Sequence, residues 1–208
     1  MPSRIDPSPP STSPLAPPAS DKLQVVGVGA SAGGLESLEQ LFAEIPPDSG
    51  LTFAVVQHLS PDFKSMMDEI LGRRSQIPVQ MAENGVLLEP NRVYLLPSSK
   101  EMTVENGRLV LTEREPDRGL TLPIDHFFRS LAQDAGDRAV AVILSGSGSD
   151  GSRGVRDVKR VGGWVFAESP ESARFDGMPL AALATGLVDF VGPASRLGGA
   201  LLDLARDG

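Results

Sequence analysis

Three side chains of the types used in acyl transfer follow three short apolar segments of this 208-residue chain. They are Ser31 after residues 23–28, His58 after residues 52–56, and Asp150 after residues 139–144. A serine hydroxyl is a weak nucleophile until a neighbouring base takes its proton. Imidazole is the side chain whose ordinary pKa lies nearest to operating pH, and a carboxylate can hold its tautomer and stabilise its cation. The three residue types therefore predict a nucleophilic serine with a histidine base.

The serine lies in a run of small residues, Gly29-Ala30-Ser31-Ala32-Gly33. This run fits Gly-x-Ser-x-Gly, the pattern of a sharp turn that exposes a nucleophile after a strand. A helix is expected to begin directly after the turn, and its first N–H groups are free to bind a developing oxyanion. We expect the N–H groups near Ala32 and Gly33 to contact the oxyanion or the substrate.

Simpler interpretations of the same residues stay open. Gly27-Val28-Gly29-Ala30-Ser31-Ala32 also fits Gly-x-Gly-x-x-Gly/Ala, the turn that binds a dinucleotide. That interpretation expects an acidic residue about 20 residues on, at the end of the second strand, where this chain has Gln57-His58. The pattern therefore favours the nucleophile. Asp150, which precedes a glycine, is also typical of a turn or a helix cap.

Strand-like and helix-like segments alternate along most of the chain. β-α-β order implies parallel pairing with right-handed crossovers. Helices are expected at residues 35–45, 64–73, 124–133, 152–161, 179–185 and 194–205, and a further strand at 164–167. Parallel strands end at one edge of the sheet, where ligands bind, so the three candidate residues should share one rim. Trp164 is expected in the core or in a pocket wall.

The middle of the chain has a different pattern. Asn106-Gly107 separates two apolar runs, residues 102–104 and 109–111, and predicts a type I′ hairpin. Another strand is expected at residues 93–96, so part of the sheet is predicted to be antiparallel or mixed. The predicted fold class is a doubly wound, mostly parallel, Rossmann-like three-layer α/β sheet with an antiparallel hairpin addition.

Composition excludes several classes of protein. The chain has 19 basic and 27 acidic residues, a formal charge of −8, and no cysteine. Absence of cysteine excludes thiolate catalysis, zinc–cysteine sites, iron–sulfur clusters and disulfides. We expect no cofactor and no metal, no nucleic-acid partner because basic residues are not clustered, and no membrane insertion because no apolar run approaches about 18 residues. No secretory signal pattern is evident, so a cytoplasmic location is expected.

The beginning of the chain differs from the rest. Residues 1–20 hold seven prolines and five serines and are predicted to be a disordered leader or linker, because they offer too little apolar surface to fold. Residues 21–208 are predicted to form a single domain.

Several ordered motifs resemble the catalytic domain of the chemotaxis receptor methylesterase, CheB, over about residues 22–205. The motifs are Gly29-Ala30-Ser31-Ala32-Gly33-Gly34, Val55-Val56-Gln57-His58-Leu59, Leu122-Pro123-Ile124-Asp125 to Ser130, Ile143-Leu144-Ser145-Gly146-Ser147-Gly148-Ser149-Asp150-Gly151, and Gly177-Met178-Pro179. The order Ser, His, Asp also differs from that of α/β-hydrolases, in which the histidine comes last.

The resemblance implies hydrolysis of glutamate γ-methyl esters on chemoreceptor cytoplasmic helices, and often deamidation of glutamines there. It implies Ser31 as nucleophile, His58 as base and Asp150 as orienting partner, with a methyltransferase or a sensor kinase as a further partner. The family commonly has threonine at the position of Ala32 and methionine at that of Ser147. The resemblance thus implies that the loop around Ser147 also contacts the oxyanion or the substrate. It also commonly has a receiver domain, which is not expected here. These departures motivate the alternative of a catalytically weakened module that binds receptors or a kinase.

Overall fold

The structure is a computed structural model that describes residues 24–57, 66–114 and 121–207, without the side chain of Asp207. The predicted leader at residues 1–20, the domain start at residue 21 and His58 lie outside the described residues. The first two residues of the helix predicted at 64–73 do so as well.

Among the described residues, seven parallel strands form the central sheet, in the order β3-β4-β2-β1-β7-β8-β9. The strands are β1 Val25–Ala30, β2 Thr52–Gln57, β3 Val79–Met81, β4 Arg92–Leu95, β7 Ala139–Ile143, β8 Trp164–Glu168 and β9 Phe190–Gly192. All residues of β1 and β7 are buried, because helices cover both faces of the sheet. Runs of valine with small residues, as in β1, and of alanine, valine and isoleucine, as in β7, are typical of such strands.

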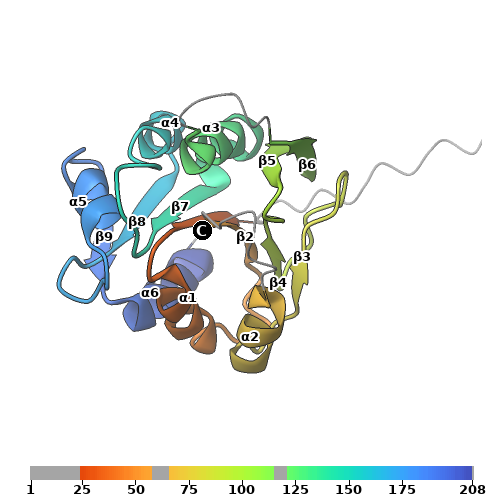
Figure 1. Ribbon diagram of the computed structural model, residues 1–208, viewed down its shortest axis with the longest axis horizontal. Helices are drawn as coiled ribbons and strands as arrows, with labels where there is room; N and C mark the ends of the chain where they lie inside the picture. Colours follow the sequence, from red (N-terminus) through yellow and green to blue (C-terminus); the bar gives the residue numbers. More distant parts are fainter. Residues whose placement is uncertain (1–23, 58–65, 115–120, 208) are drawn as a thin grey trace, which may run out of the picture.

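In the part of the chain that the structure describes, six α-helices and one short 3-10 helix connect and cover these strands. The helices are α1 Gly34–Ala43, α2 Met67–Arg74, α3 Pro123–Ala135, η1 Gly136–Arg138, α4 Gly154–Arg160, α5 Gly177–Leu183 and α6 Ala194–Asp207. Side chains of α1, α2 and α6 pack on one face of the sheet, and those of α3, α4 and α5 on the other (Figure 1). The predicted three-layer α/β fold is confirmed.

The predicted hairpin is also confirmed, as β5 Lys100–Glu105 paired antiparallel with β6 Arg108–Glu113. Asn106 and Gly107 have φ of 53° and 70°, as a type I′ turn requires. The hairpin is a separate two-stranded sheet that contacts α3 (Figure 1). The prediction of antiparallel strands within the main sheet was wrong, since β4 pairs in parallel with both β2 and β3.

Trp164 is not part of the core, one of the two places expected for it, because it is 42% exposed. It is the first residue of β8, at the edge of the sheet opposite the strands' carboxyl ends. The ammonium of Lys159 lies 5.6 Å from the centre of its ring. A strand's end residue has few neighbours above it, so even a large apolar side chain there remains accessible.

The strand order places a switch point between β1 and β7. From β1 the chain builds β2, β4 and β3 on one side, then returns to pair β7 with the other side of β1 and continues to β8 and β9. Loops that leave β1 and β7 must therefore diverge. In open α/β sheets, ligands bind in the crevice outside the strand ends at such a point.

Candidate active site

Ser31 directly follows β1, at the switch point. The Gly33 backbone is left-handed, with φ of 72°, and Gly33 is the N-cap of α1. The Gly34 N–H donates to the Ser31 carbonyl over 2.9 Å and closes a tight turn. Ser31 is half-buried in this turn. The local geometry agrees with the strand–turn–helix context that a nucleophilic serine needs.

Ser145, directly after Leu144 at the end of the β7 run, ties this turn to its surroundings. The Ser31 N–H donates to the Ser145 carbonyl over 3.0 Å. The Ser145 hydroxyl donates to the Ala32 carbonyl over 2.9 Å and accepts the Phe175 N–H over 3.0 Å. Because Ser145 is fully buried, these bonds hold the serine turn in one position relative to the loops after β7 and β8.

The Glu168 carboxylate holds the backbone of Ser145. Glu168 is the last residue of β8, is 2% exposed, and accepts the Ser145 N–H with Oε2 over 2.9 Å. The buried carboxylate thus fixes the residue that in turn fixes the turn containing Ser31.

Gly146 lies against the serine. A Cβ added at Gly146 would lie 2.9 Å from the Ser31 Cβ and would collide with the Met178 sulfur. The Gly146 N–H donates to the Phe175 carbonyl, and the Met178 N–H donates to the Gly146 carbonyl. Only a residue without a side chain fits here, so the turn, the loop after β7 and the start of α5 are in close contact.

The carboxylate of Asp150 lies in the same loop after β7 and is 3% exposed. Its Oδ2 accepts the Ile124 N–H over 3.0 Å, and its Oδ1 accepts the N–H groups of Asp125 and Gly151, each over 2.9 Å. Ile124 and Asp125 belong to the first turn of α3, where N–H groups have no partner within the helix. Three bonds therefore fix the orientation of Asp150, which caps α3, as the simpler interpretation expects.

Asp125 makes the reciprocal cap. Its Oδ1 accepts the N–H groups of Arg153 and Gly154 over 2.9 and 2.8 Å, at the start of α4. Its Oδ2 is buried without a hydrogen-bond partner among the described residues. Burial is the largest of the effects that raise the pKa of Asp125, and the nearby charge of Asp150 raises it further. Two neighbouring buried carboxylates thus join α3, α4 and the loop after β7.

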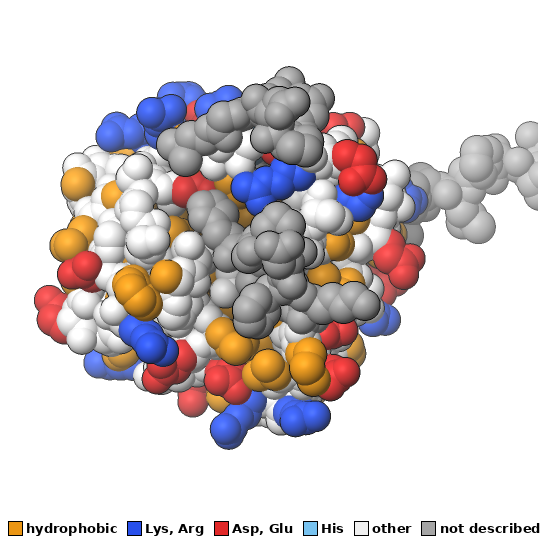
Figure 2. Space-filling model, viewed as in Figure 1, with side chains coloured by type: hydrophobic (Ala, Val, Ile, Leu, Met, Phe, Trp, Pro, Cys, Tyr) orange, Lys and Arg blue, Asp and Glu red, His pale blue; other side chains and the backbone are white. Residues whose placement is uncertain are grey.

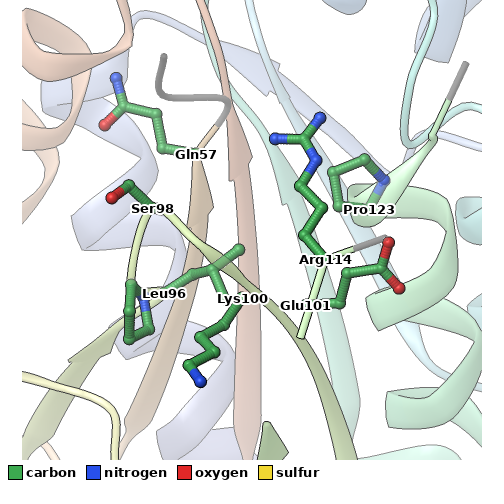
Figure 3. Close-up of a pocket in the computed structure, with 8 residues that line it drawn as sticks. Gln57, Leu96, Ser98, Lys100, Glu101, Arg114 and Pro123 are labelled. Carbon is green, nitrogen blue, oxygen red and sulfur yellow. The ribbon is translucent and has the colours of Figure 1, made fainter. Parts of the chain in front are cut away.

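Gln57 ends β2 and lies on the other side of the turn. Its side-chain Nε2 donates to the Ser31 carbonyl over 3.4 Å. Figure 3 shows Gln57 beside a small hollow whose wall includes Ser98, Arg114 and Pro123. The Arg114 guanidinium donates to the Thr121 hydroxyl over 3.0 Å. The structure thus places the end of β2, which precedes His58 in the sequence, against the serine turn.

The predicted oxyanion residues have different surroundings. Ala32 and Gly33 are half-buried in the turn, whereas Ser147 is exposed. Gly148 next to it has φ of 85°, in the left-handed region, and the backbone bends there. The structure brings the Ser31 turn and the loop that carries Ser147 and Asp150 together at one edge. Their roles, and that of His58, stay predictions.

Sequence reasoning assigned no role to Asp125, Ser145 or Glu168. Ser145 and Glu168 do carry a local signal, because each is a polar residue at the carboxyl end of a buried apolar strand. Asp125 carries a weaker one, as an acidic residue in the first turn of a helix. The described residues include no group of three or more histidine, cysteine or acidic side chains placed to bind a metal.

The arrangement agrees with comparisons of the whole chain. Residues 26–201 match the sequence profile described as CheB methylesterase. The chain belongs to the CheB methylesterase family. Over 180 residues it is 38% identical to the "Protein-glutamate methylesterase/protein-glutamine glutaminase 3" of Anaeromyxobacter dehalogenans. Over 185 residues it is 35% identical to the "Protein-glutamate methylesterase/protein-glutamine glutaminase" of Nitrosospira multiformis.

The match to a CheB structure covers the catalytic domain. The crystal structure of the Thermotoga maritima CheB methylesterase catalytic domain superposes with a TM-score of 0.80 at 30% identity, covering 87% of this chain and 98% of that one. The aligned part covers 86% and 88% of this chain but only 53% and 52% of the two curated CheB relatives. The chain thus spans about half their length.

The surface of this CheB-family domain is mixed in charge. Acidic and basic side chains are interspersed on the face in Figure 2. Among the described residues, no helix is both long and apolar enough to cross a bilayer.

Proposed function

We propose that this chain is a serine hydrolase that removes methyl groups from glutamate γ-methyl esters of chemoreceptor-like proteins. The observation that carries the proposal is the position of Ser31: it lies in a tight turn at the switch point, hydrogen-bonded to the loop that holds Asp150. Membership in the CheB methylesterase family supports the ester as substrate.

In the proposed reaction, the Ser31 Oγ attacks the ester carbonyl while His58 accepts its proton. Backbone N–H groups near Ala32, Gly33 and Ser147 stabilise the tetrahedral oxyanion. Collapse of this intermediate breaks the bond to the methoxy group, which leaves with the proton from His58 as methanol. Water then attacks the acyl-enzyme, and this hydrolysis releases the glutamate carboxylate and regenerates free Ser31.

Asp150 is proposed to orient the His58 imidazole. Its carboxylate is buried and held by three N–H donors, and this rigidity suits a group that fixes a neighbouring ring. An exposed carboxylate on a free loop would lose that orientation.

We propose the cytoplasmic helices of methylated chemoreceptors as the partner, and a methyltransferase or sensor kinase as a further one. The two relatives above are named both methylesterase and glutaminase. Deamidation of a glutamine follows the same steps with ammonia in place of methanol, so both activities are proposed for one site.

The experiment combines two measurements on the full chain. A fluorophosphonate that labels activated serines, with the adduct mapped by mass spectrometry, tests the nucleophile without any protein substrate. Methanol release from a methylated chemoreceptor fragment tests the reaction. We expect labelling at Ser31, and loss of several powers of ten in methanol release in Ser31→Ala.

A serine elsewhere on the same edge is the matched control. Ser149→Ala removes an exposed hydroxyl from the neighbouring loop, at a residue with no proposed role in the reaction, so labelling at Ser31 should persist. Retention of full methanol release in Ser31→Ala would refute the proposal. Binding of the receptor fragment without methanol release would favour the binding-module alternative.

A further inference from the structure

We propose that Phe175 and Arg174 form a rim that binds the substrate protein beside the ester, on an acidic helical segment. This inference rests on the proposed function and adds a substrate-binding site outside the triad. The two residues lie in the loop between β8 and α5, and both side chains are exposed.

The rim lies next to the serine turn. A Cβ added at Gly33, two residues after Ser31, would lie 3.1 Å from the Phe175 ring and 2.9 Å from the Arg174 Cβ. The Phe175 N–H donates to the Ser145 hydroxyl, and its carbonyl accepts the Gly146 N–H over 2.9 Å. The same Ser145 accepts the Ser31 N–H. Phe175 is therefore held at a fixed place relative to the nucleophile.

The Phe175 side chain is 43% exposed despite this fixed backbone. The Arg174 guanidinium carbon lies 6.0 Å from the centre of its ring, within the range of a cation–π contact. A preorganised aromatic–arginine pair loses little conformational entropy on binding, and both residue types are enriched among residues that dominate binding energy.

The geometry of a helical substrate brings it onto this pair. Side chains three and four positions apart on a helix are neighbours about 5–6 Å apart. When the ester of one residue reaches Ser31, a side chain three or four positions away on the same face of the substrate helix lies over the neighbouring part of the serine turn, at Gly33. The turn at Gly33 is where the Phe175 ring lies, so the ring can cover the aliphatic part of such a side chain.

Arg174 adds a preference for negative charge. The product of the proposed reaction is a carboxylate, so a segment with several glutamyl sites carries carboxylates beside any ester that remains. The chain as a whole has a formal charge of −8 and would repel such a segment at long range. A guanidinium beside the nucleophile offsets that repulsion locally.

The experiment measures binding and turnover separately. Binding of a methylated chemoreceptor fragment is measured in the Ser31→Ala background, where no turnover occurs. We expect added Phe175→Ala to weaken binding about tenfold and Arg174→Gln about threefold, with the Arg174 effect lost at about 1 M salt, where screening acts over about 3 Å. With Ser31 present, Phe175→Ala should raise KM and leave fluorophosphonate labelling within twofold of wild type.

Trp164→Ala is the matched control. Trp164 is exposed to 42%, almost as much as Phe175, and also has a cation over its ring, but it starts β8 at the opposite edge of the sheet. Its replacement should leave binding unchanged. Unchanged binding of the receptor fragment by Phe175→Ala would overturn the proposed rim. So would an equal weakening of binding by Trp164→Ala, or a loss of labelling in Phe175→Ala as large as its loss of binding. Failure of wild type to release methanol, with the rim effects on binding intact, overturns only the proposed function.

Discussion

Asp125 and Asp150 cap each other's helices: Asp150 accepts the Asp125 N–H at the start of α3, while Asp125 accepts the Arg153 and Gly154 N–H groups at the start of α4. The helix that Asp125 caps begins just after the loop that carries Asp150. The position of the proposed orienting carboxylate therefore depends on a second carboxylate, which a list of triad residues does not include.

We expect Asp125→Ala to destabilise the fold and impair the site together. Loss of the acceptor leaves two N–H groups unpaired, at a cost of about 1–3 kcal/mol in the free energy of unfolding by urea. The loosened Asp150 should slow fluorophosphonate labelling of Ser31 about tenfold under conditions where the protein is folded.

Asp157→Ala is the control for that change. Asp157 also links α4 to α3, through an ion pair with the exposed Arg129 at 3.3 Å. Such pairs contribute about 0–1 kcal/mol, so labelling should stay at the wild-type rate. Normal labelling in Asp125→Ala, or equal slowing in both variants, would contradict the role assigned to the reciprocal caps.

The pH dependence of stability should report on Asp125. Burial raises the pKa of its carboxyl in the folded protein above the ordinary value of 3.8, so the folded state keeps this proton to higher pH than the unfolded state. Stability from this group is complete below the unfolded pKa and is lost as pH rises through the folded pKa. Asparagine does not titrate, so the Asp125→Asn variant lacks this pH-dependent contribution.

The measurement is therefore urea unfolding of wild type and Asp125→Asn from about pH 3 to 8. The free energy of unfolding of the variant minus that of wild type should increase as pH rises above about 4. A difference that stays flat, or that decreases with pH, would show that the folded-state pKa of Asp125 is not raised.

Ser145→Ala tests the junction between the serine turn and the loop after β8. The change leaves the Ala32 carbonyl and the Phe175 N–H without their partner, and we expect a loss of about 1–3 kcal/mol in stability and a slowing of Ser31 labelling by about tenfold.

Ser130→Ala provides a control with the same chemistry elsewhere. The Ser130 hydroxyl also bridges two backbone groups, donating to Phe127 and accepting from Val104, between α3 and β5. Similar destabilisation with unchanged labelling is expected. If the two variants label at the same rate, Ser145 has no specific role in positioning the nucleophile.

Gly146→Ala should inactivate the site through contact alone. The added methyl group meets Met178 and the Ser31 Cβ, so the nucleophile must move, and displacement by about 1 Å can reduce the rate about 100-fold. Gly199→Ala adds the same methyl to α6, where nothing lies within 4 Å, and should stabilise the helix by about 0.5–1 kcal/mol. Labelling kinetics and thermal unfolding measure both; a fully active Gly146→Ala would contradict the close packing described here.

Much of the scaffold was predictable because its signals are local. Apolar runs such as 139–144 and the helical spacing of Phe127, Phe128 and Leu131 report burial directly, and crossover handedness then places Ser31 and Asp150 at one edge. The Asn106-Gly107 pair is typical of a turn with positive φ at both residues, and it predicted the hairpin correctly. Strands β3 and β9 escaped prediction because three residues carry too little pattern, and neighbouring strands supply the pairing.

The sequence by itself determined the α/β alternation, the small-residue turn at Ser31 and the family to which the chain belongs. Tertiary structure alone decided that Asp125 and Asp150 cap one another, that Ser145 joins the serine turn to Phe175, and that Trp164 is exposed while β4 pairs in parallel. These hydrogen bonds join residues 25 to 113 positions apart in the sequence. Such pairs leave no periodic pattern in the chain, because only folding brings their groups within 3 Å of each other.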